Sequence, residues 1–350
     1  MRSLFMSFFL ANWFFYIFAT LCIFNSELCF GSYGVWKENF EVRSKSVSVY
    51  TIGSEERVLI GSDNGVLLCL NAKSQFFNPL WECDLGNPII GVAPSENGFI
   101  YCSSIDESKG NSTVFCINKN GNEIWKTDAP FQVWNIVVSK NQKKIFLLSN
   151  DYEENRGFVV CINIQGDFLW EKGLPGLDAE FTMGWGMTSD RSGNIFCSTY
   201  DGQIVCFGEK GTILWRHTVT NDHSKLKGIG VDSEGNIYCA GKKHLYAFHL
   251  NSNKLIEKHG HCLEERVRSI FVDKNDLVYV SCDNGHIYMF EEIFRSGGLF
   301  SSDRIEFKVA DSFLPNIKEK QLVYQLAVDS DLKAYFGDET FFYCIRFDPK

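Results

Sequence analysis

Five tryptophans recur at an almost constant interval and constrain the fold more than any other feature of the sequence. They are separated by 45, 44, 45 and 45 residues, and they are Trp36, Trp81, Trp125, Trp170 and Trp215. A fixed period of this size is the signature of a repeat architecture, in which each copy forms one unit of supersecondary structure. We therefore expect a series of similar units along the chain.

Each unit has the pattern of a four-stranded antiparallel meander. In the clearest copy, strands are predicted at Ile195–Thr199 and Gln203–Phe207, joined by a two-residue hairpin turn at Asp201-Gly202. The next strand contains Trp215, and an apolar segment ahead of the unit predicts a further, innermost strand. Glycine suits the turn because it accepts the positive φ that such turns require.

These strands are short and apolar on both faces, which is unfavourable in a sheet that has one face in water. Both faces become buried if the sheets pack radially around an axis, as the blades of a β-propeller do. Copies of the third strand occur at residues 66–70, 114–117, 158–162, 203–207, 244–248, 286–290 and 341–345. The predicted fold class is an all-β, seven-bladed β-propeller of four-stranded antiparallel blades. Six or eight blades would need one copy to be misread, and a two-sheet sandwich would not produce the fixed period.

The two ends of the repeat region predict how the ring closes. Residues 35–40 have the signature of a fourth strand but no blade before them, whereas residues 341–345 have no fourth strand after them. An N-terminal strand that completes the last blade removes two exposed sheet edges, and it brings Trp36 close to Phe342. Blades five and six are expected to be the least regular, because Glu257 stands where a tryptophan is expected and residues 296–304 read as a flexible insertion.

The first residues of the chain read as a targeting segment. Residues 4–24 are apolar except for three polar positions, and Arg2 precedes them. This composition predicts a signal peptide cleaved after Gly31, or an uncleaved signal anchor, since the apolar run approaches the length of a membrane span. The chain is thus divided into a signal peptide or signal anchor at residues 1–31 and a propeller at residues 32–350. Both alternatives place the propeller on the secreted, lumenal or extracellular side of a membrane.

The net charge and one sequence motif restrict the expected partners and indicate a site of modification. The chain has a net charge of −9 at pH 7 and no block of lysine or arginine, so a nucleic-acid partner is not expected. Asn111-Ser112-Thr113 is the single N-glycosylation sequon, and it lies in a polar run between two predicted strands. Asn111 is therefore a predicted glycosylation site.

The repeat resembles that of the PQQ-like, or quinoprotein-like, β-propellers. The shared pattern is a strand, an Asp-Gly turn, a strand ending in Cys-Phe or Cys-Ile, an Asn-x-x-Gly turn and an Ile/Leu-Trp pair. It is clearest at residues 65–81, 113–125, 157–170 and 202–215, and the resemblance covers roughly residues 35–350. The resemblance implies the propeller fold well and the chemistry poorly, because the family includes cofactor-dependent dehydrogenases, outer-membrane assembly lipoproteins and sensor domains.

The sequence also departs from this family at the positions that matter for chemistry. Quinoprotein dehydrogenases carry an adjacent pair of cysteines beneath the cofactor, and this chain has no Cys-Cys dipeptide and no Cys-x-x-Cys-His haem site. No catalytic residue is therefore assigned. No cofactor is predicted, and PQQ with calcium is kept only as the alternative.

The cysteines follow the period of the blades and not the spacing of metal ligands. They are predicted to be small apolar fillers of the blade interior, at positions Cys69, Cys116, Cys161, Cys206 and Cys344. Counting outward from the Asp201-Gly202 turn places Cys197 opposite Cys206, at a distance near the short limit for a disulfide. A Cys197–Cys206 disulfide is thus a further possibility in an oxidising compartment.

Ligands are expected at the mouth of the central channel, where the loops enter the innermost strands. The residues predicted there are Trp134, Trp185, His223, Arg266, Arg268 and Tyr324. Aromatic walls with two arginines suit a planar or anionic ligand, or a peptide. The alternative is that these are ordinary residues of the rim. No metal site is predicted, because His259 and His261 have no identifiable third ligand.

Taken together, these features favour a secreted or membrane-anchored propeller that binds a protein or peptide partner without catalysing a reaction. The competing class is an enzyme, either a quinoprotein-like oxidoreductase or a metal-dependent hydrolase with its site at the channel mouth.

Overall fold

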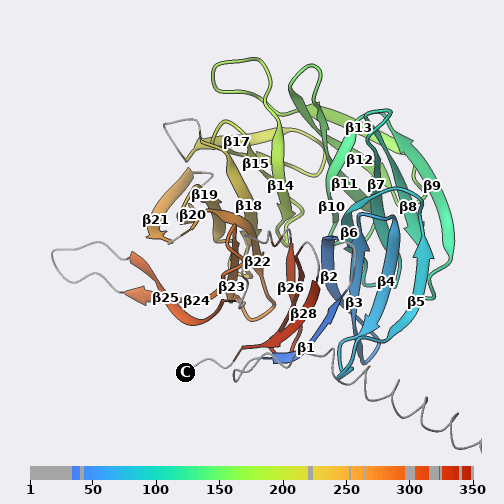
Figure 1. Ribbon diagram of the computed structural model, residues 1–350. Coiled ribbons are helices and arrows are strands. Elements are labelled where there is room, and N and C mark those ends of the chain that lie inside the picture. Colours follow the sequence, from blue (N-terminus) through green and yellow to red (C-terminus); the bar gives the residue numbers. More distant parts are fainter. Residues whose placement is uncertain are drawn as a thin grey trace, which may run out of the picture.

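The computed structural model describes residues 34–39, 43–219, 224–251, 254–263, 265–295, 304–314, 323, 325–338 and 341–347. In these residues the strands form seven four-stranded antiparallel sheets set around a central axis (Figure 1). The fold is the seven-bladed β-propeller that the repeat predicts. None of the described segments is a helix with the length and apolarity needed to span a membrane. The predicted targeting segment, residues 4–24, lies outside the described residues.

The blades follow one another in chain order, and in each of the first six the innermost strand comes first. Blades 1 to 3 are β2 (Ser44–Ile52), β3 (Glu55–Ser62), β4 (Val66–Asn71) and β5 (Pro79–Asp84); β6 (Ile89–Pro94), β7 (Ile100–Asp106), β8 (Asn111–Ile117) and β9 (Glu123–Ala129); and β10 (Gln132–Val138), β11 (Lys144–Asp151), β12 (Arg156–Asn163) and β13 (Phe168–Gly173). Blades 4 to 6 are β14 (Gly184–Ser189), β15 (Ile195–Thr199), β16 (Gln203–Phe207) and β17 (Ile213–Thr218); β18 (Leu226–Val231), β19 (Ile237–Gly241), β20 (His244–Asn251) and β21 (Lys254–Cys262); and β22 (Val267–Val272), β23 (Val278–Cys282), β24 (Ile287–Arg295) and β25 (Arg304–Phe313).

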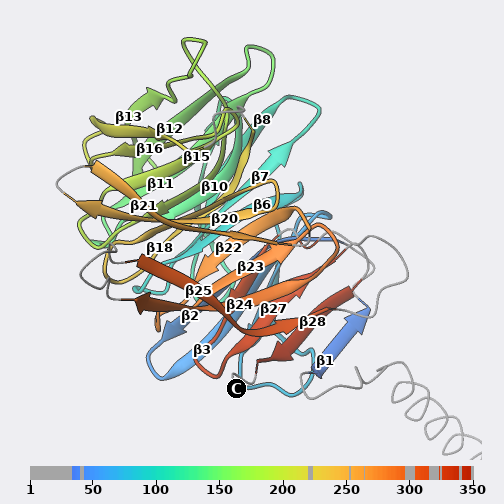
Figure 2. The same cartoon turned by 90° about the vertical axis from the view of Figure 1, so that its left-hand side faces the viewer.

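Blade 7 closes the ring with strands from both ends of the chain. It contains β26 (Leu326–Val328), β27 (Lys333–Gly337), β28 (Phe341–Arg346) and, on the outside, β1 (Gly34–Asn39). Figure 2 shows β1 beside β28. The rings of Trp36 and Phe342 lie 5.9 Å apart, and Trp36 also contacts Phe77 of blade 1 at 5.8 Å. The predicted closure is therefore confirmed.

The periodic tryptophans lock each outer strand to the next blade. The Trp81 indole donates a hydrogen bond to the carbonyl of Lys119 at 3.0 Å, and that of Trp125 does the same to Ile164 at 2.9 Å. Each ring packs on a turn glycine, since a Cβ on Gly121 would lie 2.9 Å from Trp81. Gly121 has a φ of +87°, so a glycine at this position permits both the turn and the close approach of the Trp81 ring.

Three blades share a buried link between an aspartate and a tyrosine. Asp232 Oδ1 accepts hydrogen bonds from the backbone of the following turn, and its Oδ2 accepts one from the Tyr238 hydroxyl at 2.8 Å. The same Asp-to-Tyr bond recurs from Tyr279 to Asp273 at 3.3 Å, and Tyr335 lies 2.9 Å from Asp329. The link satisfies the turn donors and fixes the second strand against the first.

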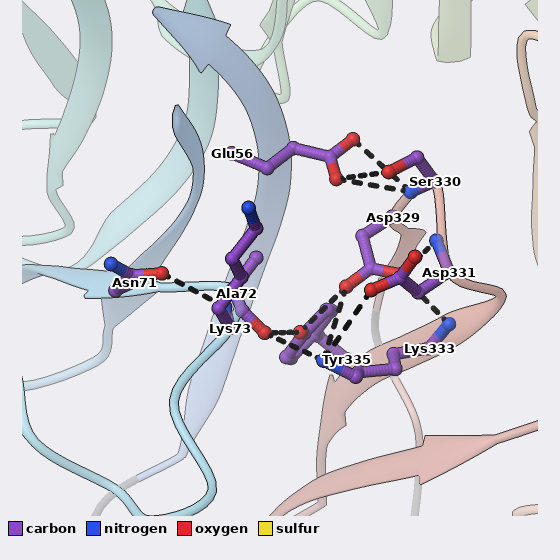
Figure 3. A network of polar contacts seen from close by, with 9 residues as sticks. All are labelled: Glu56, Asn71, Ala72, Lys73, Asp329, Ser330, Asp331, Lys333 and Tyr335. Carbon is purple, nitrogen blue, oxygen red and sulfur yellow. Dashed lines mark hydrogen bonds and ion pairs between the residues drawn. The ribbon is translucent and has the colours of Figure 1, made fainter. Parts of the chain in front are cut away.

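The third of these links also joins blade 7 to blade 1 (Figure 3). The Tyr335 hydroxyl lies 2.9 Å from the Ala72 carbonyl, which also accepts a 2.9 Å hydrogen bond from Lys333 Nζ. The backbone N–H of Ser330 donates to the Glu56 carboxylate at 3.1 Å. Blades 7 and 1 are thus joined by a second set of contacts, which lies closer to the propeller axis than β1.

Replacing Tyr335 with phenylalanine is expected to lower the free energy of unfolding by about 1–3 kcal/mol, because it removes the buried hydroxyl that lies 2.9 Å from both the Ala72 carbonyl and the Asp329 carboxylate. The matched control is Tyr279→Phe, which removes the bond to Asp273. Chemical denaturation of both variants measures the difference. Equal losses would show that the contact with Ala72 adds nothing to ring closure.

One predicted register is wrong. Cys197 pairs with Val205 and Cys206 with Phe196, because the hairpin loop is one residue longer than the predicted two-residue turn. The Thr199 hydroxyl accepts a hydrogen bond from the Gln203 backbone N–H at 2.9 Å, which stabilises this longer loop. A shift by one residue sends the two side chains to opposite faces of the blade. The expected disulfide is therefore not formed, and both thiols are free.

The predicted role of the repeated cysteines as interior fillers is confirmed, since these five thiols are buried in the blades. Burial raises the pKa of Cys206 to about 12, which keeps this thiol protonated and unreactive at neutral pH. We expect iodoacetamide to spare Cys197 and Cys206 in the native protein and to alkylate both after unfolding without a reductant. A peptide pair linked through these two residues in the mass spectrum would contradict the assigned register.

The irregular blade 5 also needs one correction. Glu257 pairs with Phe248, whereas His259 pairs with Ala247, the position that corresponds to Cys206 opposite Trp215 in blade 4. His259, and not Glu257, therefore takes the place of the periodic tryptophan. The predicted insertion at residues 296–304 falls mostly outside the described residues.

Candidate functional site

Six innermost strands carry a β-bulge at the same place, close to the end at which the chain enters the strand. A bulge leaves an extra residue outside the hydrogen-bonded ladder and re-aims its side chain. These extra residues, here called the bulge ring, are Lys45, Ile90, Trp134, Trp185, Lys227 (with Gly228) and Arg268. The backbone thus delivers one side chain from each of blades 1 to 6 to the same level of the propeller.

The innermost strands surround an axial cavity of about 810 Å³. Five members of the bulge ring line it, and the sixth, Lys227, has its ammonium 5.3 Å from the centre of the Trp185 ring. Farther along the same strands the lining is mainly apolar, with side chains that include Val92, Ile136, Ile229, Ile270 and Phe271. The polar side chains of Ser48, Asn135 and Thr188 also line it. The cavity therefore has a chemically mixed mouth and a mainly apolar interior.

The structure brings three of the predicted site residues together. Trp134, Trp185 and Arg268 line the same cavity. Arg266 is exposed, precedes β22 and does not line the cavity. His223 and Tyr324 lie outside the described residues.

The sequence analysis missed three members of the bulge ring, namely Lys45, Ile90 and Lys227. Their signal is positional, because each follows the first paired residue of an innermost strand, as Trp185 follows Gly184. Aligning the copies on that residue, instead of on the tryptophans, would have found them.

Aromatic side chains extend the wall on blades 3 and 4. The ring of Trp185 lies 5.6 Å from that of Tyr200, and the ring of Trp134 lies 6.1 Å from that of Tyr152. The Lys225 ammonium sits 4.0 Å above the Tyr200 ring, a cation–π arrangement. The wall is thus apolar with cations at one border.

Positive charge gathers on blades 5 and 6. Arg268 Nε lies 3.0 Å from Asp283 Oδ1, and Lys227 Nζ lies 4.0 Å from Asp283 Oδ2. Burial lowers the pKa of Lys227, and the neighbouring Arg268, Arg266 and Lys225 lower it further, against the opposite effect of Asp283. One carboxylate is therefore shared by closely spaced cations.

Ring order divides the mouth into two parts. Blades 2, 3 and 4 contribute Ile90, Trp134 and Trp185, whereas blades 5, 6 and 1 contribute Lys227, Arg268 and Lys45. Neighbouring blades in the chain are neighbours in the ring. Within the bulge ring, one side is therefore apolar and the other is cationic, while the carboxylates of Asp63 and Glu107 also line the cavity.

The described residues contain no group of three or more His, Cys, Asp or Glu side chains placed to hold a metal ion. The carboxylates that line the axial cavity are those of Asp63 and Glu107.

Comparison with known proteins agrees with the fold. A family model described as the lambda-carrageenase beta-propeller domain matches residues 146–253. The crystal structure of the Myceliophteria thermophila Cps50 (Swd1) beta-propeller domain is similar, with a TM-score of 0.67 and 12% sequence identity over 89% of this chain and 100% of that chain. No curated protein matches. The propeller is thereby confirmed, while membership of the PQQ-like family stays a prediction.

Proposed function

We propose that this protein is a non-catalytic propeller scaffold that binds a segment of a partner protein at the mouth of its central channel. The observation that carries the proposal is the bulge ring, in which five blades each deliver one side chain to a single cavity and a sixth places Lys227 beside Trp185. These residues stand outside the ladder, so the blades do not need their side chains for pairing.

Size and chemistry support a binding site. Ligand pockets have volumes of about 300–1,000 Å³ and combine apolar walls with a few placed polar groups. The axial cavity has about 810 Å³, aromatic side chains on one side and cations on the other. The matching solved structure and family model are both described as beta-propeller domains, which supports a scaffold but names no partner of this chain.

The test uses a double variant of the mouth, Trp185→Ala with Arg268→Ala. Its matched control is Phe168→Ala with Lys126→Ala, which changes two exposed residues of outer strands. Partners are captured by cross-linking from the source cells and quantified by mass spectrometry. We expect a partner that the control retains and the mouth variant loses. Equal capture by both variants would overturn the proposal.

The proposal includes the secreted or lumenal side of a membrane, reached through the segment 1–31. Asn111 begins β8 and is partly exposed, next to an exposed turn, and Glu107 of that turn lines the cavity. We expect the mature protein to carry a glycan at Asn111, which a glycosidase removes with a matching loss of mass. A full chain with unmodified Asn111 in cells that glycosylate secreted proteins would contradict this compartment.

A further inference from the structure

The two sides of the channel mouth favour two different kinds of chemical group. Ile90, Trp134 and Trp185 form the apolar side, and the lining beyond them remains apolar along Ile136 and Ile229. A polar group pushed into this interior would lose water without regaining hydrogen bonds, whereas an apolar side chain gains from burial. The depth of the cavity therefore suits an apolar anchor.

The cationic side favours an anionic group. Lys227 and Arg268 share Asp283 at 4.0 and 3.0 Å, and Arg266 and Lys225 add to the positive potential at Lys227. A second carboxylate placed beside Lys227 would offset the mutual repulsion of these cations. Charge-assisted hydrogen bonds from lysine or arginine to a carboxylate are also among the stronger polar contacts.

We infer that the mouth recognises an acidic peptide segment with one apolar anchor residue. The anchor enters the cavity against Ile90, Trp134 and Trp185, and the flanking carboxylates contact Lys227 and Arg268. This inference rests on the proposed function, since it names the chemistry of the segment that the same site takes.

A sulfated polysaccharide is the other polyanion with the charge that this mouth favours. Its hydroxyl groups cannot fill the apolar interior without losing hydrogen bonds, whereas a leucine or phenylalanine side chain can. The apolar lining at Ile136, Ile229, Ile270 and Phe271 therefore favours the peptide. The polysaccharide enters the experiment as a competing probe.

The experiment measures fluorescence anisotropy of short capped peptides with the purified protein. The main probe has a central leucine flanked on both sides by glutamates. The other probes replace the leucine with glutamate, replace the glutamates with lysines, or are a sulfated oligosaccharide. We expect the main probe to bind, the all-glutamate probe to bind about tenfold more weakly, and the lysine probe not to bind.

Variants assign the two contacts separately. Lys227→Gln leaves Asp283 paired with Arg268, and it is expected to weaken the main probe by about tenfold. Ile90→Ala is expected to weaken the main probe while leaving the all-glutamate probe unchanged. The control is Lys126→Gln, an exposed cation on the outer strand β9, with no expected effect. Thermal melts confirm that each variant is folded.

The outcomes separate this inference from the proposed function. Binding of the main probe that Lys227→Gln leaves unchanged would overturn the inference, as would binding of the sulfated oligosaccharide alone. If no peptide binds but the mouth double variant still loses a cross-linked partner, the proposed function stands and the acidic-anchor inference fails. If no peptide binds and the mouth double variant retains every cross-linked partner, both the proposed function and the acidic-anchor inference fail.

Discussion

Replacing Trp36 with alanine is expected to lower the free energy of unfolding by about 3–5 kcal/mol, the usual cost of removing a large packed aromatic side chain. Trp36 fills the junction between blades 7 and 1, with its ring 5.9 Å from Phe342 and 5.8 Å from Phe77. Its loss leaves a cavity where the two ends of the chain meet. The expected fall in melting temperature is about 4–8 °C, given an unfolding entropy of about 2.1 cal/mol/K per residue over a propeller of this size.

Two truncations provide the control for this prediction. A chain that begins at residue 34 keeps β1, and it is expected to melt like the full chain. A chain that begins at residue 43 lacks β1, exposes the outer edge of β28 and is expected to lose cooperative unfolding. Circular dichroism and calorimetry distinguish the two. Similar melting curves for both truncations would show that the N-terminal strand does not close the ring.

The second large effect is expected at Gly121. Alanine there must adopt a φ of +87°, and its Cβ would lie 2.9 Å from the Trp81 ring. Backbone strain of this kind costs about 1–3 kcal/mol, and forcing the packed ring aside adds a similar amount. The Gly121→Ala variant is therefore expected to lose about 2–6 kcal/mol of stability.

The matched control for this change is Gly235→Ala. Gly235 has the same φ of +87°, but an added Cβ would have no atom within 4 Å. The difference between the two variants in chemical denaturation isolates the contact with Trp81. If both variants lose the same amount, the tryptophan does not rest tightly on the turn of the next blade.

The architecture could be predicted because the length of each repeat and the unmatched segments at its two ends can be read directly from the sequence. The spacing of the tryptophans gives the size of a blade, and the unmatched segment around Trp36 gives the closure. Both follow from burial, which requires every apolar face and every sheet edge to find a partner. Trp81 and Trp125 then lie where a locking role requires them.

The errors concern single residues in loops and bulges. The register of Cys197 failed because the Thr199 hydroxyl stabilises a longer loop than the Asp201-Gly202 pair indicates. Glu257 was misplaced because the β20–β21 hairpin is longer than that of blade 4: Ala247 pairs with His259, 12 residues further on, whereas Cys206 pairs with Trp215, nine residues further on. A pattern of period two cannot register one extra residue, and such a residue reverses which face a side chain occupies.

Only part of the candidate site could be predicted, because bulges place several of its residues. Trp134, Trp185 and Arg268 were selected for their chemistry, and they share one cavity. Lys45 and Lys227 look like ordinary surface lysines in the sequence. Their importance comes only from the bulge that places them beside the others, which is a property of the backbone.

The pairing of β1 with β28 has a consequence for the order of events during synthesis. About 300 residues separate Asn39 from Phe341, and a ribosome adds about 5–20 residues per second. The first strand therefore waits about 15–60 s before its mate leaves the ribosome. By the end of that interval, six finished blades form an open arc, and the apolar faces of blades 1 and 6 that blade 7 covers in the closed ring are exposed. Nascent chains of this protein should thus depend on chaperones until translation terminates.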